Sequence, residues 1–234
     1  MIRDIFNIVN KELIELRRNK EFIVYYCMFI LVLGILIPIS SKDSILHNNW
    51  YVVGLTFQII AITIPANLTA DTFAGEKERK TLETLLFTPV SITILYIGKV
   101  IFIMLIALLV TLLCFIVNYL TVFIMYYKAY GIIHFKIYSA ISLYTMLINT
   151  LIISSFETLL GTLFSIKLKS ARGAGMINFF IGAPLIAPMA MRLYTTNITW
   201  KFIFKYEIVL IVLDFILILL VKRFFTRDTI MRSI

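Results

Sequence analysis

Residues 71–91 read DTFAGEKERKTLETLLFTPVS, and they separate two apolar runs that are each long enough to cross a bilayer. This segment carries seven charged residues in 21 positions of a very apolar chain. From Glu76 the spacing predicts one helix of about three turns, with Glu76 four positions before Lys80 as an ion pair on the helix surface. Pro89 ends this helix, because proline lacks a backbone N–H and its ring clashes with the preceding turn.

The predicted helix has an apolar side and a well-marked exit. Leu82, Leu85 and Leu86 lie at steps of three and four, so they share one face. Beyond the proline, Ser91 is expected to cap the helix that begins at Ile92. Residues 71–91 are therefore predicted to place a short amphipathic helix in water, with short connections to two membrane helices.

The composition predicts an integral membrane protein. Hydrophobic residues make up 61% of the 234 positions, charged residues make up 15%, and the mean hydropathy is +0.96. A soluble globular domain lies well outside these values. Six long, mostly uncharged runs are predicted to be transmembrane helices, which makes the fold an all-α membrane domain, and a β-barrel is excluded because its strands would be short and alternating. The runs are Phe22–Ser40, Trp50–Ala70, Val100–Tyr127, Ile137–Ile166, Ala174–Met191 and Tyr206–Val221.

The chain has a net charge of +9, and the positions of its lysines and arginines predict the topology. Sixteen of the 22 Lys and Arg residues lie in the N-terminal segment, between runs two and three, between runs four and five, or in the C-terminal tail. By the positive-inside rule these segments are cytoplasmic. We therefore expect a multi-pass protein of the cell membrane, of bacterial type, with both termini in the cytoplasm and no nucleic-acid partner.

The two ends of the single domain, residues 1–234, are also basic. Residues 1–21 place Ile2, Ile5, Phe6, Val9, Leu13 and Leu16 at helical spacing, which predicts an amphipathic helix lying on the inner membrane surface among lipid headgroups. A solvated leader with chance periodicity is the alternative. Residues 222–234 form a basic cytoplasmic tail.

One stretch of the chain resembles a known family. Residues Phe73–Lys99 read FAGEKERKTLETLLFTPVSITILYIGK, and members of the ABC type-2 permease family carry a pattern like FAGEKERGTLELLLSTPVSRxxILxGK between their second and third spans. The similarity covers 27 contiguous residues at the same place in a six-span layout. Lys80 stands where glycine is common in the family, and Ile92 stands where a basic residue is common.

The resemblance implies the membrane subunit of an exporter driven by ATP. Residues 76–88 would then be the coupling helix, which sits in a cleft of a cytoplasmic ABC ATPase subunit present in two copies. The permease itself would pair with a second copy or with a related chain. Its implied contact residues are Glu76, Glu78, Arg79, Thr81, Leu82, Glu83, Leu85 and Leu86. The implied substrates are drugs, antimicrobial peptides or other amphipathic molecules.

The chain is not expected to hydrolyse ATP. A P-loop needs the pattern G-x-x-x-x-G-K-[ST], but the single Gly-Lys pair, Gly98-Lys99, has threonine at position 93 and valine at position 100. ATP and magnesium are therefore expected on the partner ATPase, and no cofactor or metal on this chain. A passive solvated loop at 76–88, or a membrane scaffold that only tethers an ATPase, would also fit the composition.

Three acidic residues lie within predicted spans, where charges are costly and often functional. Glu157 and Asp214 suggest the competing hypothesis, a secondary transporter or channel driven by an ion gradient. Glu207 lies near the outer end of its span. The alternative for all three residues is a structural one, in which each pairs with a neighbouring helix and holds the bundle together.

Overall fold

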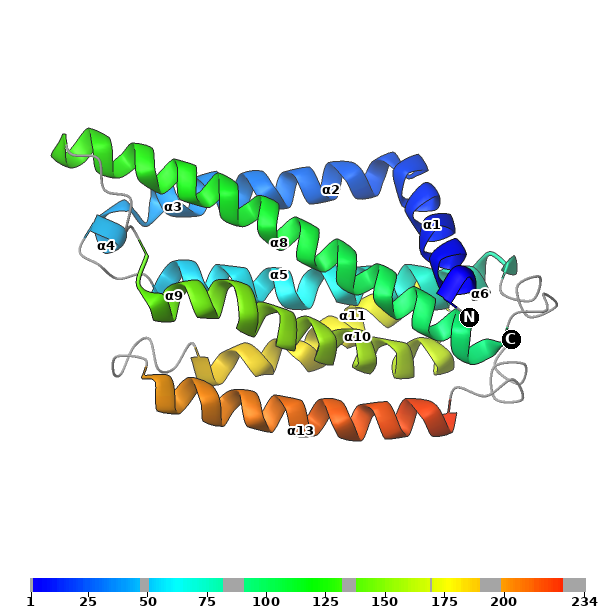
Figure 1. The fold of residues 1–234 in the computed structure, drawn as a ribbon. Coiled ribbons are helices and arrows are strands. Elements are labelled where there is room, and N and C mark those ends of the chain that lie inside the picture. The colour runs from blue at the N-terminus through cyan, green and yellow to red at the C-terminus, as the bar shows by residue number, and fades with distance from the viewer. Residues whose placement is uncertain are drawn as a thin grey trace.

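The computed structural model describes residues 2–46, 51–81, 91–131, 138–168, 170–189 and 199–224. Within these ranges the chain is helical and contains no strand, which confirms the all-α prediction. Figure 1 shows long helices running side by side, with the shorter α1 (Ile2–Arg18) lying across one end of the bundle. The last described residues of the chain, at the end of α13 (Trp200–Phe224), lie at this same end.

Four helices of the described ranges are long and apolar enough to cross a membrane. The first joins α2 (Lys20–Leu31) through a π-helical turn to α3 (Ile37–Ser40), and the short α4 (Lys42–Leu46) follows it. The others are α5 (Tyr51–Thr69) with its continuation to Glu78, α8 (Ile92–Tyr130), and α9 (Ala140–Tyr144) joined to α10 (Thr150–Lys167). With 39 residues, α8 is about 58 Å long, so it extends several turns beyond a hydrocarbon core of about 30 Å.

The fifth and sixth predicted spans correspond to α11 (Ala171–Gly182) and α13. After its 12 residues α11 gives way to a 3₁₀ turn, Ala183–Ile186, because Pro184 removes a backbone donor there. Pro184 therefore interrupts the run Ala174–Met191 that was predicted as the fifth span. The helix α13 has 25 residues but carries several charged side chains along its length, and neither helix is among the four. Six membrane crossings therefore remain a prediction.

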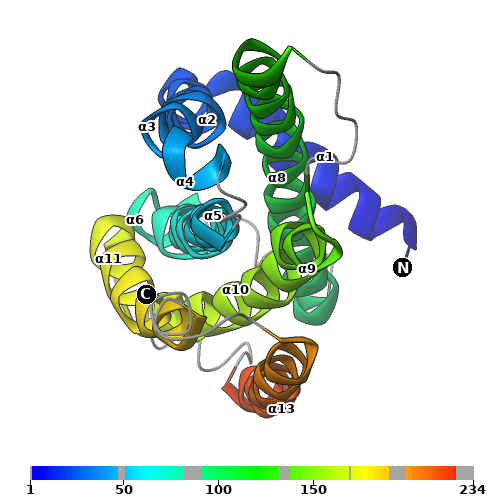
Figure 2. The same ribbon diagram turned by 90° about the vertical axis from the view of Figure 1, so that its left-hand side faces the viewer.

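The centre of the bundle is α5. Figure 2 looks along the helices and shows α5 surrounded by α2, α8, α10 and α11. Its sequence is apolar on every side, which is the pattern of a helix buried all round. Val53, Phe57, Ile60 and Ile64 are fully buried. A displacement of either end of α5 would therefore be transmitted through packing to most of the helices around it.

The N-terminal amphipathic helix is present as α1, and burial divides its apolar residues between two surroundings. Val9 is buried, and Ile5 and Leu16 pack with it against the core beside α8. Ile2 and Phe6 are 81% and 69% exposed, so they remain available to lipid, as the prediction of an interfacial helix requires. Asn19 then caps α2 by accepting a hydrogen bond from the Glu21 N–H.

Candidate functional site

The second membrane helix does not end where α5 does. It continues through a π-helical turn, Ala70–Gly75, into α6 (Glu76–Glu78), and the chain then turns at Arg79 and Lys80. Lys80 has a φ of 57°, in the left-handed region that ends a right-handed helix. The prediction of one helix beginning at Glu76 is therefore wrong. Residues 76–78 are the last turn of the second membrane helix, and residues 82–90 lie outside the described ranges.

The left-handed Lys80 leads to a first prediction, because Lys80 occupies the position where the resembling family often has glycine. A left-handed backbone costs a residue with a Cβ about 1–2 kcal/mol and costs glycine almost nothing. Replacing Lys80 by glycine is expected to raise the apparent melting temperature in detergent by a few degrees. Lys77→Gly, inside α6, is the matched control and is expected to lower it. A lower melting temperature for Lys80→Gly would contradict the left-handed assignment.

Glu76 is the centre of a buried charge cluster. Its side chain is only 2% exposed, and its two carboxylate oxygens contact two lysines from different helices. Oε1 lies 2.8 Å from Lys11 Nζ of α1, and Oε2 lies 2.7 Å from Lys99 Nζ of α8. The predicted surface pair with Lys80 is therefore wrong, because the two long-range cations draw the Glu76 side chain into the protein.

Glu12 of α1 completes the cluster. Its Oε1 lies 3.2 Å from Lys11 Nζ and 3.2 Å from Lys99 Nζ, and its side chain is almost fully buried. Two lysines and two glutamates thus alternate, so each charge has opposite charges beside it. Buried ions need this kind of pairing, since an unpaired ion loses several kcal/mol of hydration energy. The charge cluster, Lys11–Glu12–Glu76–Lys99, ties α1, α6 and α8 together.

Lys99 is the most deeply buried member of the charge cluster, with no exposed surface. Besides its two glutamates, it donates a 2.6 Å hydrogen bond to the Thr72 carbonyl oxygen in the π-helical turn. Its ammonium also lies 5.3 Å from the centre of the Phe73 ring, a cation–π contact. Every one of these partners belongs to another element, so Lys99 fixes α8 against the end of the second membrane helix.

Lys11 lies at the edge of the charge cluster and is partly exposed. Burial acts to lower its pKa, but the attraction of Glu76, helped by Glu12 and Glu15, outweighs burial and raises the pKa above its ordinary value. Lys11 therefore stays charged over the whole physiological pH range.

A glycine allows α1 to approach α8 at the charge cluster. A Cβ on Gly98 would lie 2.8 Å from Ile8 Cγ2 and 2.9 Å from Ile8 Cβ, closer than real side chains pack. Ile8 is β-branched and cannot move these atoms away by changing a distant torsion. Gly98 therefore sets the distance between α1 and α8, next to Lys99.

Two exposed contacts surround the charge cluster. Arg79 places Nη1 2.9 Å from Asp71 Oδ1, which fastens the turn at residues 79–80 to the preceding helix. Burial acts to lower the pKa of Arg79, but its bond with Asp71 raises it overall. On the other side, Glu78 accepts a 3.1 Å hydrogen bond from the Ala171 N–H at the start of α11. The end of the second membrane helix therefore also contacts α11.

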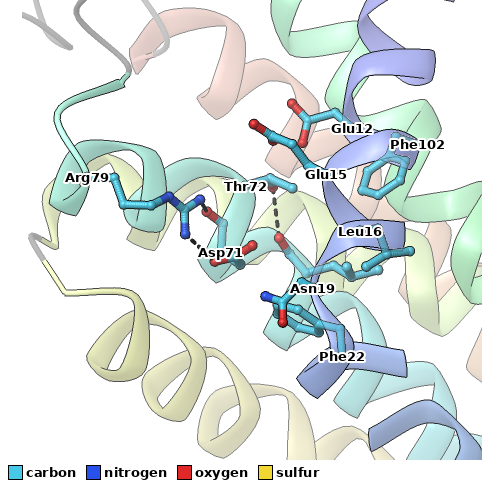
Figure 3. Close-up of a pocket in the computed structure, with 10 residues that line it drawn as sticks. Glu12, Glu15, Leu16, Asn19, Phe22, Asp71, Thr72, Arg79 and Phe102 are labelled. Carbon is cyan, nitrogen blue, oxygen red and sulfur yellow. Dashed lines mark hydrogen bonds and ion pairs between the residues drawn. The ribbon is translucent and has the colours of Figure 1, made fainter. Parts of the chain in front are cut away.

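A cavity of about 200 Å³ opens beside the charge cluster. Figure 3 shows Arg79 pointing at Asp71 on one side and Glu12 and Glu15 of α1 on the other. Its other lining residues are Leu16, Asn19, Phe22, Leu68, Thr72 and Phe102. Carboxylates at the rim and an apolar wall suit a cationic group on an apolar stem, such as the side chain of arginine or lysine.

The structure places the contact residues predicted from the sequence in different surroundings. Glu76 is buried and cannot be reached by a partner, which corrects its assignment as a contact residue. Glu78, Arg79 and Thr81 are exposed, and the Thr81 hydroxyl donates to the Glu76 carbonyl oxygen. Four predicted contacts lie outside the described residues, namely Leu82, Glu83, Leu85 and Leu86.

Sequence reasoning missed Lys11, Glu12 and Lys99 as members of a site, although a signal was present. Glu12 follows Val9 by three positions, on the side of α1 that packs against the bundle. Lys99 follows Leu95 by four positions and precedes Phe102 by three, so it shares a face of α8 with these two buried residues. A charge in line with buried apolar residues of a helix predicts a buried ion pair, although it does not identify the partner.

The acidic residues of the predicted spans lie against different helices. Asp214 of α13 accepts a 2.5 Å hydrogen bond from the Ser155 hydroxyl of α10, and Glu207 accepts a 2.7 Å bond from the Tyr144 hydroxyl. Glu157 is fully buried against Gly182 of α11, and its carboxyl oxygens have no hydrogen-bond partner among the described residues. No described contact joins Glu157 to Asp214.

Glu12, Glu15 and Glu76 also bring three carboxylates within 4.8 Å of one another, as some metal sites do. The ammonium groups of Lys11 and Lys99 already lie 2.7–3.2 Å from these oxygens. The lysines therefore supply the positive charge that a metal ion would otherwise bring.

No match emerges when the chain is compared with protein-family models, with curated proteins or with solved structures.

Proposed function

We propose that this chain is the membrane-spanning permease subunit of an ABC transporter that exports drugs, antimicrobial peptides or other amphipathic molecules. Two cytoplasmic ATPase subunits bind and hydrolyse ATP, and a second permease chain, identical or related, completes the pathway. The proposal rests on the resemblance of residues 73–99 to the ABC type-2 permeases. It is supported by the four helices that are apolar enough to cross a membrane.

One observation carries the mechanism. Glu76 and Lys99 lie near the two ends of the resembling segment, and their side chains meet at 2.7 Å. The charge cluster therefore holds the end of the second membrane helix, at Glu76, against the first part of α8, at Lys99. Because these two ends are held together, a force on the segment between them cannot be taken up by separating α6 from α8. Force applied to residues 78–91 is therefore delivered jointly to α5, α8 and, through Lys11 and Glu12, to α1.

In this mechanism the ATPase contacts the exposed part of the loop and not Glu76. Glu78, Arg79 and Thr81 begin this contact surface, and the leucine face predicted at 82–86 continues it. ATP binding closes the ATPase pair, and the closed loop moves α5 and α8 together. Closure then shifts the balance between inward-open and outward-open forms, because the two forms differ in how the loops are spaced.

The proposal predicts a specific contact with a second polypeptide. A photocrosslinking residue at Lys80 or Thr84 is expected to capture a cytoplasmic ABC ATPase in cells of the source organism, while one at Lys128 captures none. ATPase activity should appear only when that partner copurifies, and Glu78→Ala with Glu83→Ala should lower it several-fold. ATP hydrolysis by the permease alone, or no capture at either loop position, would contradict the proposal.

Glu157, which is buried and has no hydrogen-bond partner among the residues that the structure describes, favours a second candidate, transport driven by an ion gradient. Its test is uptake into vesicles that contain no ATP but carry a proton or sodium gradient. Gradient-driven uptake that disappears in Glu157→Gln would support this candidate. ATP-dependent transport that persists in Glu157→Gln and in Asp214→Asn would leave both acids with structural roles only.

A further inference from the structure

A second cavity, of about 360 Å³, lies between α8, α10 and α13, and none of the four members of the charge cluster lines it. Both α8 and α13 pack against α10, which fills the floor of the groove between them. The lining is mostly apolar, and the residues are Thr93, Tyr96, Ile97, Val100, Ile101, Leu159, Ile218, Val221 and Lys222. We call this cavity the α8–α13 groove.

The α8–α13 groove is elongated along the helices. On α8 its wall runs from Thr93 through Ile97 to Ile101, a distance of about 12 Å at 1.5 Å per residue. Ile218 and Val221 form the opposite wall, one turn apart on α13. A narrow apolar slot of this length matches a hydrocarbon chain of roughly nine or ten carbons, given about 1.3 Å per CH₂ in an extended chain.

Thr93 and Lys222 lie at one end of the α8–α13 groove, and Tyr96, the third polar residue of its lining, lies one turn along α8 from Thr93. Thr93 is in the first turn of α8, Lys222 is in the last turn of α13, and both side chains are exposed. Figure 1 places the start of α8 and the end of α13 at the same end of the bundle, the end that carries α1. The groove therefore pairs an apolar slot with a cationic, hydrogen-bonding mouth.

We propose that the α8–α13 groove binds an anionic phospholipid, with one acyl chain in the slot and the phosphate against Lys222. Charge complementarity selects this occupant. A zwitterionic lipid brings its own cation to the mouth and gains less from Lys222, whereas an anionic headgroup gains the full attraction. By the positive-inside rule the mouth lies at the cytoplasmic leaflet, where anionic lipids gather. The proposal needs a bilayer around the chain but does not depend on ATP-driven transport.

The test uses the full-length chain in phosphatidylcholine nanodiscs. A small fraction of the lipid carries a photoactivatable diazirine on one acyl chain, attached either to phosphatidylglycerol or to phosphatidylcholine. Crosslinked peptides are then mapped by mass spectrometry. The phosphatidylglycerol probe is expected to label residues 93–101 and 218–222 at least three-fold more than the phosphatidylcholine probe does.

Two pairs of variants separate the mouth from the slot. Lys222→Gln should reduce phosphatidylglycerol labelling to the phosphatidylcholine level, while Lys201→Gln, at the other end of α13, should leave it unchanged. Ile218→Trp fills the slot and should reduce labelling by both probes, while Ile208→Trp on the same helix should not. Circular dichroism shows whether each tryptophan variant has folded. Lys222 is exposed, so Lys222→Gln changes the charge at the mouth and leaves the apolar slot unchanged.

Several results would overturn the inference. Equal labelling by the two probes, unchanged in Lys222→Gln, would show ordinary boundary lipid with no anionic preference. Labelling spread evenly along α13 would show that the slot holds no lipid. Crosslinks between two copies of the chain through residues 97 and 218 would show that a second protein chain fills the groove.

Discussion

Replacing Lys99 by methionine is expected to lower the stability of the protein by about 3–5 kcal/mol, because it leaves two buried carboxylates to share one partly exposed lysine. Methionine has a similar length and no charge, so the substitution removes the ammonium without opening a large cavity. Glu12 and Glu76 are both almost fully buried, so hydration by water cannot replace the stabilisation that the Lys99 ammonium gives them. In detergent the apparent melting temperature should fall on the order of 10 °C.

A second substitution distinguishes charge imbalance from damaged packing. Glu76→Gln in the Lys99→Met background removes one of the stranded carboxylates, so it should restore at least half of the lost melting temperature. Lys128→Met is the matched control, because Lys128 is an exposed lysine on the same helix and should change little. If the single Lys99 variant melts within about a degree of the parent, the charge cluster contributes no net stability.

The same pair of variants also bears on the proposed function. If the charge cluster closes the base of the loop, Lys99→Met should separate ATP hydrolysis from transport. The ATPase would still bind to residues 78–91 and hydrolyse ATP, but transport per ATP should fall. Loss of both activities together would mean that the charge cluster is needed for folding or docking and not for transmission.

The elements that depend on local sequence could be predicted. Ser91 caps α8 by accepting a 3.4 Å bond from the Ile94 N–H, and α8 begins at Ile92 as expected. The break after Gly182 follows from Pro184. The amphipathic α1 follows from its apolar periodicity. Each of these depends on residues within a turn or two of one another, and such rules can be applied to a single sequence.

The candidate site could not be predicted, since its contacts are long-range. Local spacing assigns Glu76 to Lys80, four positions away, but the structure pairs it with Lys11, 65 positions away. Choosing between these partners requires knowing that α1 lies across the end of the bundle. The left-handed conformation of Lys80 does not follow from the residue itself, because lysine ordinarily favours helix; the glycine common at this position in the resembling family was the one signal for it. Local spacing therefore misassigned the first turn of residues 76–88, and the functional role of this segment stays a prediction.

Replacing Gly98 by alanine is expected to loosen α1 from α8. The added methyl group would overlap Ile8 at 2.8 Å, and overpacking at such a rigid contact costs about 1–3 kcal/mol. The intrinsic gain of alanine over glycine in a helix, about 1 kcal/mol, offsets only part of this cost. Displacing α1 by even an ångström would also lengthen the contacts of Lys11 and Glu12 with α6 and α8, so steric and electrostatic losses add.

Limited trypsin digestion in detergent measures this loosening directly. Lys11, Arg17 and Arg18 lie on α1, and cleavage there should accelerate several-fold in Gly98→Ala, with little change at sites on α13. Gly173→Ala is the matched control, because a Cβ at Gly173 meets nothing closer than 3.6 Å. Ile8→Ala in the Gly98→Ala chain removes the nearest methyl group and should recover part of the protection. Unchanged cleavage of α1 in Gly98→Ala would mean that the glycine does not set the distance between the two helices, and the mechanical link from the loop to α1 would have to be abandoned.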